Sequence, residues 1–511
     1  MAKRGIIIFL SVLAVSASTF FILNKLFDQS DSFYSLYMQQ CSACHGAGFE
    51  GAAQGPALAS SDPVESGSME ELISAIKTGS PDKGMPAFGQ TLDANEIKQL
   101  AILISDVRLT GVKATDFYNI HEPFSIPDTS LETELHTFSI ESVATGINPL
   151  PYSIAPLPDG RMLVTEKTQG LRIVEQDGSL SSLIAGTPKT NDALYESPDY
   201  FVKYGLGWML DVALHPDYES NGWIYMTYGD RCTACNQISK SSDSAVSMLK
   251  LIRGRIVDGS WVDEETIWAA DSATYSTMSD ITLGGRMAFD DAGHLFFTLG
   301  MKGTTNYTGF QDLSQPVGKI YRINDDGSIP DDNPFVNAPA AMPSIWTYGH
   351  RSPQGLEFNP RTQQLWGTEM GPRGGDEVNL IQPGKNYGWP LYSKGLDYDG
   401  TPVEYGKELG IELDLATIEQ TKIDLTPSPG ISSFIIHDGR GFPEWKDNLI
   451  VGSLKATELY RFVIDGNEIV HKETIIKDFA RIRDVEQGPD GTIYLLLEHT
   501  DGGHIVRLVR E

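Results

Sequence analysis

The pattern of hydrophobic and polar positions divides the chain into three kinds of sequence. Residues 5–23 form an uninterrupted apolar run behind two basic residues, and about 19 such residues can cross a bilayer as a helix. Residues 92–109 place apolar side chains on one face, at the spacing of an amphipathic helix. Beyond residue 145, short apolar segments alternate with polar turns. The pattern therefore predicts an apolar leader, a small helical region and a large β region.

The β region repeats one sequence pattern, in which an apolar strand, a polar turn and a second apolar strand follow one another. The turns lie at residues 158–160, 215–217, 291–293, 359–360, 445–448 and 489–491. Six copies with hairpin-forming residues predict a six-bladed β-propeller over residues 146–511, whose loops would surround a central ligand-binding channel. Residues 110–145 lack sustained periodicity and are predicted to be a linker.

Length and composition bear on the number of domains, the expected partners and the role of the cysteines. The chain has 511 residues, more than a single ordinary core holds, so a multidomain protein is expected. Its formal net charge of −29 repels phosphate backbones, which excludes nucleic acid as an expected partner. Its four cysteines form two CxxC pairs, too few for a scaffold built from disulfides.

The N-terminal run at residues 1–25 can be interpreted in two ways. Val15, Ser16 and Ala17 offer the small residues of a signal-peptide cleavage site. The run nevertheless continues through Leu23, long enough to remain as an inner-membrane anchor. Both alternatives place the rest of the chain in the periplasm or another extracytoplasmic compartment.

The first cysteine pair belongs to a CxxCH motif, Cys41 to His45. Two thiols at this spacing add to the vinyl groups of one porphyrin, and the adjacent histidine binds the iron. Met85, in a Gly-Met-Pro loop, is the expected second axial ligand. Residues 31–109 resemble a class I cytochrome c, an all-α domain, which implies a covalent haem c on Cys41 and Cys44 and a downstream electron acceptor.

The second pair, Cys232 and Cys235, has no histidine behind it. In an oxidising compartment a local disulfide is expected. A redox role or a metal site remains an alternative.

Several long motifs in the β region resemble one family, the soluble glucose/sorbosone dehydrogenases, or quinoprotein aldose dehydrogenases. They lie at residues 318–323, 345–356, 369–380, 386–390 and 481–484. The resemblance implies that the chain uses pyrroloquinoline quinone (PQQ) and calcium to oxidise the C1 hydroxyl of an aldose.

PQQ carries three carboxylates, so its pocket needs cationic side chains with fixed donors. Arg481 and Arg483 alternate along a predicted strand and therefore face the same side. Lys455 and Arg351 match the family's other cofactor-binding positions. From the residues alone, the favoured interpretation of all four is that they are surface charges paired with nearby acids.

Calcium prefers oxygen ligands, including backbone carbonyls and carboxylates. The resemblance implies that the carbonyls of Gly371 and Pro372 hold the ion beside PQQ. It also implies a second, structural calcium site at Asp376, Glu377 and Tyr387.

The catalytic positions depart from the family pattern. Thr282 stands where the family has its general-base histidine, and a threonine hydroxyl cannot accept a proton at neutral pH as imidazole does. Met301 and Ser352 replace two further polar positions. Either Asp280 or His350, beside Arg351, serves as the base, or aldose oxidation has been lost. We therefore expect an exported quinohaemoprotein that oxidises a sugar or other alcohol and passes electrons to the haem. The alternative is a propeller that binds a ligand or partner beside an electron-transfer cytochrome.

Overall fold

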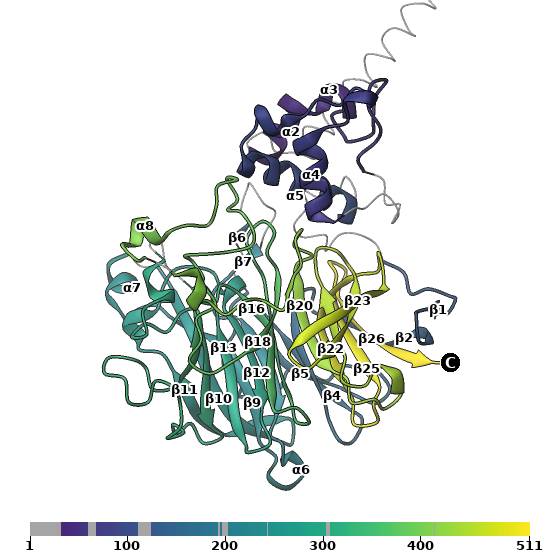
Figure 1. Ribbon diagram of the computed structural model, residues 1–511. Coiled ribbons are helices and arrows are strands. Elements are labelled where there is room, and N and C mark those ends of the chain that lie inside the picture. The colour runs from purple at the N-terminus through teal and green to yellow at the C-terminus, as the bar shows by residue number, and fades with distance from the viewer. Residues whose placement is uncertain are drawn as a thin grey trace, which may run out of the picture.

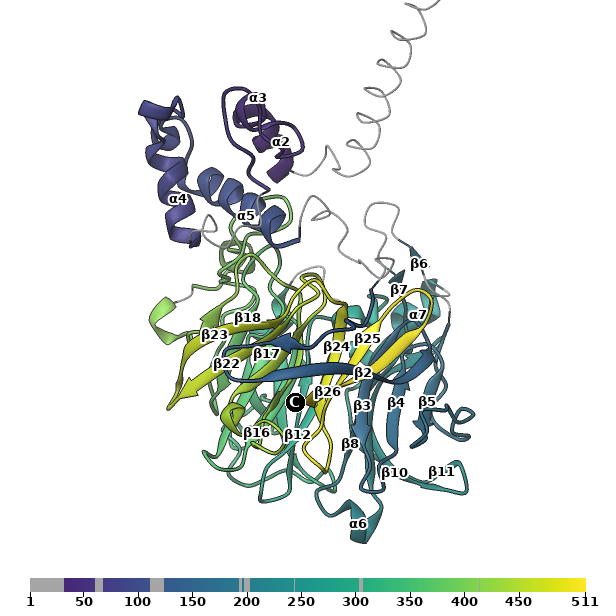
Figure 2. The same ribbon diagram turned by 90° about the vertical axis from the view of Figure 1, so that its right-hand side faces the viewer.

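The computed structural model describes residues 32–59, 68–110, 124–192, 195–196, 203–242, 244–302, 307–412 and 414–511. A small helical domain lies on one end of a large β domain (Figures 1 and 2). The apolar run at residues 5–23 is outside the described residues, so neither interpretation of it is tested. Within the described part of the chain, none of the helices is both long and apolar enough to span a bilayer.

The helical domain contains α2 (Ser32–Gln40), α3 (Ser42–His45), α4 (Met69–Thr78) and α5 (Ala94–Thr110). The predicted amphipathic helix is α5, whose buried face includes Leu100 and Ile104. It packs against α2 and α4 around the rings of Tyr37 and Phe49. Two short 3₁₀ turns, Pro81–Lys83 and Phe88–Gln90, flank the loop that carries Met85.

The β domain is a propeller of six antiparallel sheets, as predicted. In chain order, the first three blades are β3 (Pro151–Pro156), β4 (Met162–Glu166) and β5 (Gly170–Val174); β8 (Met209–Leu214), β9 (Ile224–Cys232), β10 (Val246–Val257) and β11 (Ser260–Ala269); and β12 (Gly284–Phe289), β13 (His294–Leu299), β14 (Lys319–Asn324) and β15 (Ile345–Tyr348). The fourth and fifth blades are β16 (Pro353–Asn359), β17 (Gln364–Glu369), β18 (Glu377–Ile381) and β19 (Ile423–Asp424); and β20 (Ile431–Ile436), β21 (Leu449–Ser453), β22 (Leu459–Asp465) and β23 (Glu468–Ile476). The sixth combines β24 (Arg481–Gln487), β25 (Ile493–Glu498) and β26 (Gly503–Arg510) with β2 (Thr137–Ile147) and β1 (Leu131–Glu132).

Short elements decorate the blades. They are the hairpin β6 (Tyr195–Glu196) and β7 (Lys203–Tyr204), and the helices α6 (Tyr218–Asn221), α7 (Gln237–Ser242) and α8 (Gly406–Leu409).

The six turns predicted from the sequence have the same structural role in every blade. Each joins the innermost strand to the second strand, as in the turn between β3 and β4. The innermost strands β3, β8, β12, β16, β20 and β24 contact one another in a closed ring. The repeat therefore marks the hairpin nearest the central axis.

The ring closes through a strand that the sequence pattern missed. β2 lies mostly inside the stretch expected to be a linker, and it pairs with β26, with Ile140 opposite Leu508. Phe138 and Ile140 are buried there against the last blade. The propeller consequently begins before residue 146, and the connection to the helical domain is shorter than predicted.

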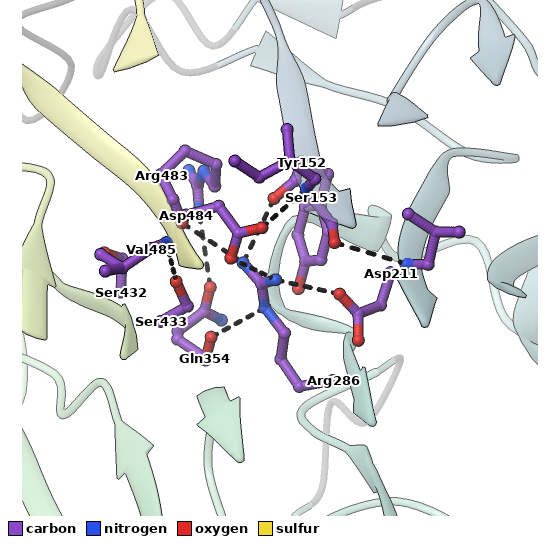
Figure 3. A network of polar contacts seen from close by, with 12 residues as sticks. Tyr152, Ser153, Asp211, Arg286, Gln354, Ser432, Ser433, Arg483, Asp484 and Val485 are labelled. Atoms are coloured by element: carbon purple, nitrogen blue, oxygen red, sulfur yellow. Dashed lines mark hydrogen bonds and ion pairs between the residues drawn. The ribbon is translucent and has the colours of Figure 1, made fainter. Parts of the chain in front are cut away.

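A single arginine ties the innermost strands together at the axis (Figure 3). The Arg286 guanidinium lies 3.0 Å from Asp211 and 2.7 Å from Asp484. It also donates hydrogen bonds to the carbonyl oxygens of Tyr152, Gln354 and Arg483. Five blades therefore share one buried cation, which holds the residues of the neighbouring cavity in register.

Candidate active site

A cavity of about 450 Å³ lies at the end of the propeller that faces the helical domain. Loops of several blades form its walls, and Ile102 and Asp106 of α5 contribute to its lining. Of the candidate residues, it brings together Thr282, Arg351, Gly371, Pro372, Asp376, Lys455, Arg481 and Arg483. Asp280, His350, Glu377 and Tyr387 are outside its lining.

One wall of the cavity carries clustered positive charge. Arg481 and Arg483 alternate on β24 and both contact the Glu498 carboxylate, at 2.9 and 2.7 Å. Lys167, which the sequence analysis did not identify, contacts the same carboxylate at 2.9 Å. In this buried set three basic side chains surround one carboxylate. A buried cluster in which basic groups outnumber carboxylates is a suitable place for an anionic ligand.

The pKa values of the set reflect this crowding. Burial, followed by the neighbouring charge of Arg483, lowers the pKa of Lys167 from 10.5 to about 7. Burial opposes ionisation of Glu498, but Arg483, Lys167 and Arg481 together hold its pKa well below its usual range. Glu498 is therefore a fixed anion that orients two guanidinium groups toward the cavity.

Lys455 completes the predicted group of cations, but it pairs with an acid from the other domain. Its ammonium group contacts the carboxylate of Asp106 on α5. Both side chains are nearly buried, with 11% and 4% of their areas exposed.

Arg351 reaches the cavity from the loop between β15 and β16. Its guanidinium donates to the carbonyl oxygens of Met370 and Gly371, at 3.1 and 2.8 Å, and to the Tyr398 hydroxyl. It also lies over the Trp389 ring, 5.2 Å from the centroid. Among the described residues, nothing accepts a hydrogen bond from its buried Nε.

The predicted calcium ligands separate into two groups. Gly371, Pro372 and Asp376 line the cavity, where Asp376 accepts hydrogen bonds from the amides of Gly371 and Ile431. Burial raises the pKa of this carboxyl.

Glu377 is the next residue in the chain and therefore faces away from Asp376. It lies opposite Glu369 on the neighbouring strand. Burial, and then Glu369, raise its pKa to about 8. The Tyr387 hydroxyl instead donates to the carbonyl of Leu380, at 2.6 Å. Within the described ranges, no group of three or more histidines, cysteines or acids is arranged to bind a metal, so the second calcium site stays a prediction.

The wall at the altered catalytic positions is largely apolar. Thr282 donates its hydroxyl hydrogen to the Met301 carbonyl at 2.7 Å. Met278, Ile281 and Met301 line the cavity around it. Where the family's histidine would present a ring nitrogen, this wall presents a short hydroxyl and methionine side chains.

Asp280, one candidate base, is committed to structural contacts. One carboxylate oxygen contacts Lys302 and accepts from the Ser247 hydroxyl, and the other accepts from the amides of Gly207 and Trp208. The residue is 2% exposed, and burial lowers the pKa of Lys302. With both oxygens occupied, Asp280 stabilises the loop beneath the altered wall.

His350, the other candidate, is also held inside the protein. Its Nδ1 lies 2.8 Å from Glu369, its Nε2 lies 2.8 Å from the Thr347 hydroxyl, and its ring stacks on Tyr387. At 1% exposure, it positions the Arg351 loop and does not reach the cavity.

The CxxCH motif forms a second candidate site, in the helical domain. Cys41 caps the start of the short helix α3, and Cys44 lies within it, next to His45. Nδ1 of His45 lies 2.8 Å from the Pro56 carbonyl oxygen, a distance that suits donation from this nitrogen. A proximal histidine held in this way directs Nε2 to a metal. A Cβ at Gly55 would lie 2.8 Å from the carbonyl oxygen of Cys44 and 3.1 Å from the His45 imidazole, so a glycine lets the chain pass this close to the motif.

The second cysteine pair behaves as expected. Cys232 and Cys235 form a disulfide at the end of β9. This pair therefore has a structural role beside the second blade.

Comparisons with known proteins match both domains of the chain. Residues 149–509 match the family Glucose / Sorbosone dehydrogenase, and residues 28–104 match Cytochrome C oxidase, cbb3-type, subunit III. The aldose sugar dehydrogenase YliI of Escherichia coli (strain K12) is 35% identical over 356 residues, which cover 69% of this chain and 88% of the relative. Quinoprotein glucose dehydrogenase B of Acinetobacter calcoaceticus is 26% identical, with 74% and 88% covered.

A solved structure shows the same architecture. The apo-form of the soluble aldose sugar dehydrogenase from Escherichia coli superposes with a TM-score of 0.62 at 31% identity, covering 73% of this chain and all of the other. The chain therefore belongs to the glucose/sorbosone dehydrogenase family and carries a cytochrome c domain in front of its propeller.

Proposed function

We propose that the chain is an exported quinohaemoprotein dehydrogenase that oxidises a sugar or a related alcohol. The observation that carries the proposal is the pair of arginines, Arg481 and Arg483, in the wall of a cavity that residues of the cytochrome c domain also line. The names of the relatives, an aldose sugar dehydrogenase and a quinoprotein glucose dehydrogenase, support a sugar substrate and a quinone cofactor.

The residues of the cavity fit PQQ. Its carboxylates match the forked donors of Arg481 and Arg483, and the buried Nε of Arg351 provides a further donor. Calcium would be held by the carbonyls of Gly371 and Pro372, with the Asp376 carboxylate beside them. When bound, PQQ supplies a two-electron acceptor for the alcohol carbon.

The protein's own residues bind, orient and shield this chemistry. The Glu498 carboxylate fixes the two arginines of β24, so their donors are in place before a ligand arrives. Arg351, held by two carbonyls and Tyr398, orients groups at the opposite edge. Methionine side chains and Ile102 of α5 exclude water from the cavity.

The cytochrome c domain would supply the electron acceptor. In the proposed site a haem is attached to Cys41 and Cys44, and its iron is held by His45 and Met85. A haem takes electrons one at a time, which suits a two-electron donor on the same chain. Export, directed by residues 1–25, would bring the chain to the compartment where such haems are attached.

The apolar wall favours a second candidate function. With Thr282 and Met301 where the family has polar groups, the propeller could bind a sugar or a partner without oxidising it. The cytochrome c domain would then be the only redox centre.

Reconstitution separates the two functions. The haem-loaded protein is mixed with PQQ and calcium, and the ferrous haem absorbance is followed while aldoses and alcohols are added. Haem reduction that requires both PQQ and a substrate supports the dehydrogenase. Arg483→Ala tests whether the cationic wall is needed for this reduction. Arg361→Ala, a change at an exposed arginine, is its matched control. PQQ binding without haem reduction by any substrate would favour the binding module.

A further inference from the structure

Helix α5 and the loop between β18 and β19 make three of the hydrogen bonds between the cytochrome c domain and the propeller. In Figures 1 and 2, α5 is the helix nearest the propeller. Asn95 and Gln99 both donate to the carbonyl of Gly400, at 2.7 and 3.0 Å, and Lys98 donates to the carbonyl of Lys394 at 2.8 Å. The loop between β18 and β19 therefore forms the seat for α5.

Apolar and aromatic contacts reinforce these hydrogen bonds. Leu396 of the same loop is 1% exposed and belongs to the hydrophobic core of the cytochrome c domain. The Arg373 guanidinium lies 4.1 Å from the centroid of the Phe33 ring. Ile102 has no exposed area in the docked arrangement. The two domains thus share a packed interface with defined partners.

The ion pair between Asp106 and Lys455 is part of the cavity lining itself. Both residues line the cavity, and Lys455 shares it with Arg351, Arg481 and Arg483. A carboxylate of the cytochrome c domain therefore contacts a cation on the wall that we assign to the carboxylates of a cofactor. Because both side chains are nearly buried, water screens the interaction little.

We propose that Asp106 is an internal competitor for the cofactor site, so that docking of the cytochrome c domain and binding of PQQ oppose each other at Lys455. The inference rests on the proposed function. A ligand carboxylate at Lys455 would lie beside Asp106, and the repulsion between the two anions loosens α5. By linkage, the docked helix lowers the affinity for PQQ by the same factor that PQQ weakens docking.

Asp106→Asn tests the competition because it removes the charge and nearly preserves the shape. Glu70→Gln removes one charge from an exposed position on α4 and is the matched control. A second variant, Asn95→Ala with Gln99→Ala, weakens the seat on Gly400 and leaves the ion pair in place. The full haem-loaded chains are titrated with PQQ at saturating calcium, and the radius of gyration is measured by small-angle X-ray scattering with and without PQQ.

We expect Asp106→Asn to bind PQQ roughly 5- to 20-fold more tightly than the wild type and Glu70→Gln. The double variant should also bind more tightly, and saturating PQQ should increase the radius of gyration of the wild type. Equal or weaker PQQ binding by Asp106→Asn, with an unchanged radius, overturns the competition while the proposed function stands. Failure of every protein to bind PQQ overturns the proposed function itself.

Discussion

The two walls of the cavity differ in how their polar groups are organised. On one wall, Arg481 and Arg483 line the cavity, and the buried carboxylate of Glu498 holds both guanidinium groups in place. On the other wall, Thr282 turns its hydroxyl to a carbonyl oxygen, and methionines cover the remaining surface. The first wall has the cationic groups that our proposal assigns to a cofactor, whereas the described residues of the second wall include no imidazole or free carboxylate.

The supports behind the two walls differ as well. Behind the cationic wall, three basic side chains, Lys167, Arg481 and Arg483, share one carboxylate, Glu498. Behind the apolar wall, Asp280 and Lys302 neutralise each other completely inside the protein. The first support prepares a binding site for an anion, and the second only maintains the shape of the wall.

The largest expected effect comes from the support behind the apolar wall. Asp280→Asn leaves Lys302 buried without its counter-charge, which should lower the free energy of unfolding by about 3–5 kcal/mol. Urea denaturation measures the loss, and Asp331→Asn, at an exposed position, is the control. Unchanged stability with lost activity would make Asp280 a base after all.

A substitution in the cationic wall should change the affinity for PQQ. Arg483→Ala removes one forked donor and leaves Glu498 less well paired, so PQQ affinity should fall by about 100-fold. Fluorescence titration with PQQ at saturating calcium measures the change. Unaltered affinity would show that this wall does not bind the cofactor, and the contrast between the walls would lose its functional meaning.

Aldose oxidation should become faster if a histidine is placed in the apolar wall. Thr282→His places an imidazole in the cavity, and a positioned general base is worth roughly 10- to 100-fold here in kcat for aldose oxidation. Thr282→Val, which only removes the hydroxyl bonded to Met301, should not increase the rate. Stopped-flow haem reduction compares the three proteins. A histidine variant no faster than the valine variant would indicate that this wall does not handle the proton.

The smallest effect concerns pH. The pKa of Lys167 is lowered to about 7 in the folded protein, so the unfolded chain binds more protons between that pH and its ordinary 10.5. Stability without PQQ should therefore rise from about pH 7 to pH 9, by at most roughly 1.4 kcal/mol per pH unit. Thermal unfolding of wild type and Lys167→Met measures the slope, which the substitution should flatten. An identical slope in both proteins would show that a group other than Lys167 causes the pH dependence.

The features that were predictable from the sequence are local. The turns of the innermost hairpins were predictable because adjacent residues encode a hairpin. The alternation of Arg481 and Arg483 places both on one face because the period of a strand is fixed. The disulfide between Cys232 and Cys235 followed from their spacing and the expected compartment.

The features that were missed depend on contacts between distant parts of the chain. Lys167 and Glu498 meet because the first and last blades are neighbours in the ring, and neither residue belongs to a recognisable motif. The pair of Asp106 and Lys455 joins two domains, so no spacing could indicate it. Asp280 looked like a free loop acid because its four partners come from other segments.

The pairing of β2 with β26 has a consequence for the order in which the chain acquires its structure. β26 ends at Arg510, so the ring cannot close until the chain has been synthesised through that strand. The cytochrome c domain ends at Thr110, and the roughly 400 residues that follow take about 20–80 s to synthesise at typical rates. The N-terminal domain therefore has all its residues long before the propeller does. The seat for α5, between β18 and β19, appears only in that interval, so docking belongs to the late steps of assembly.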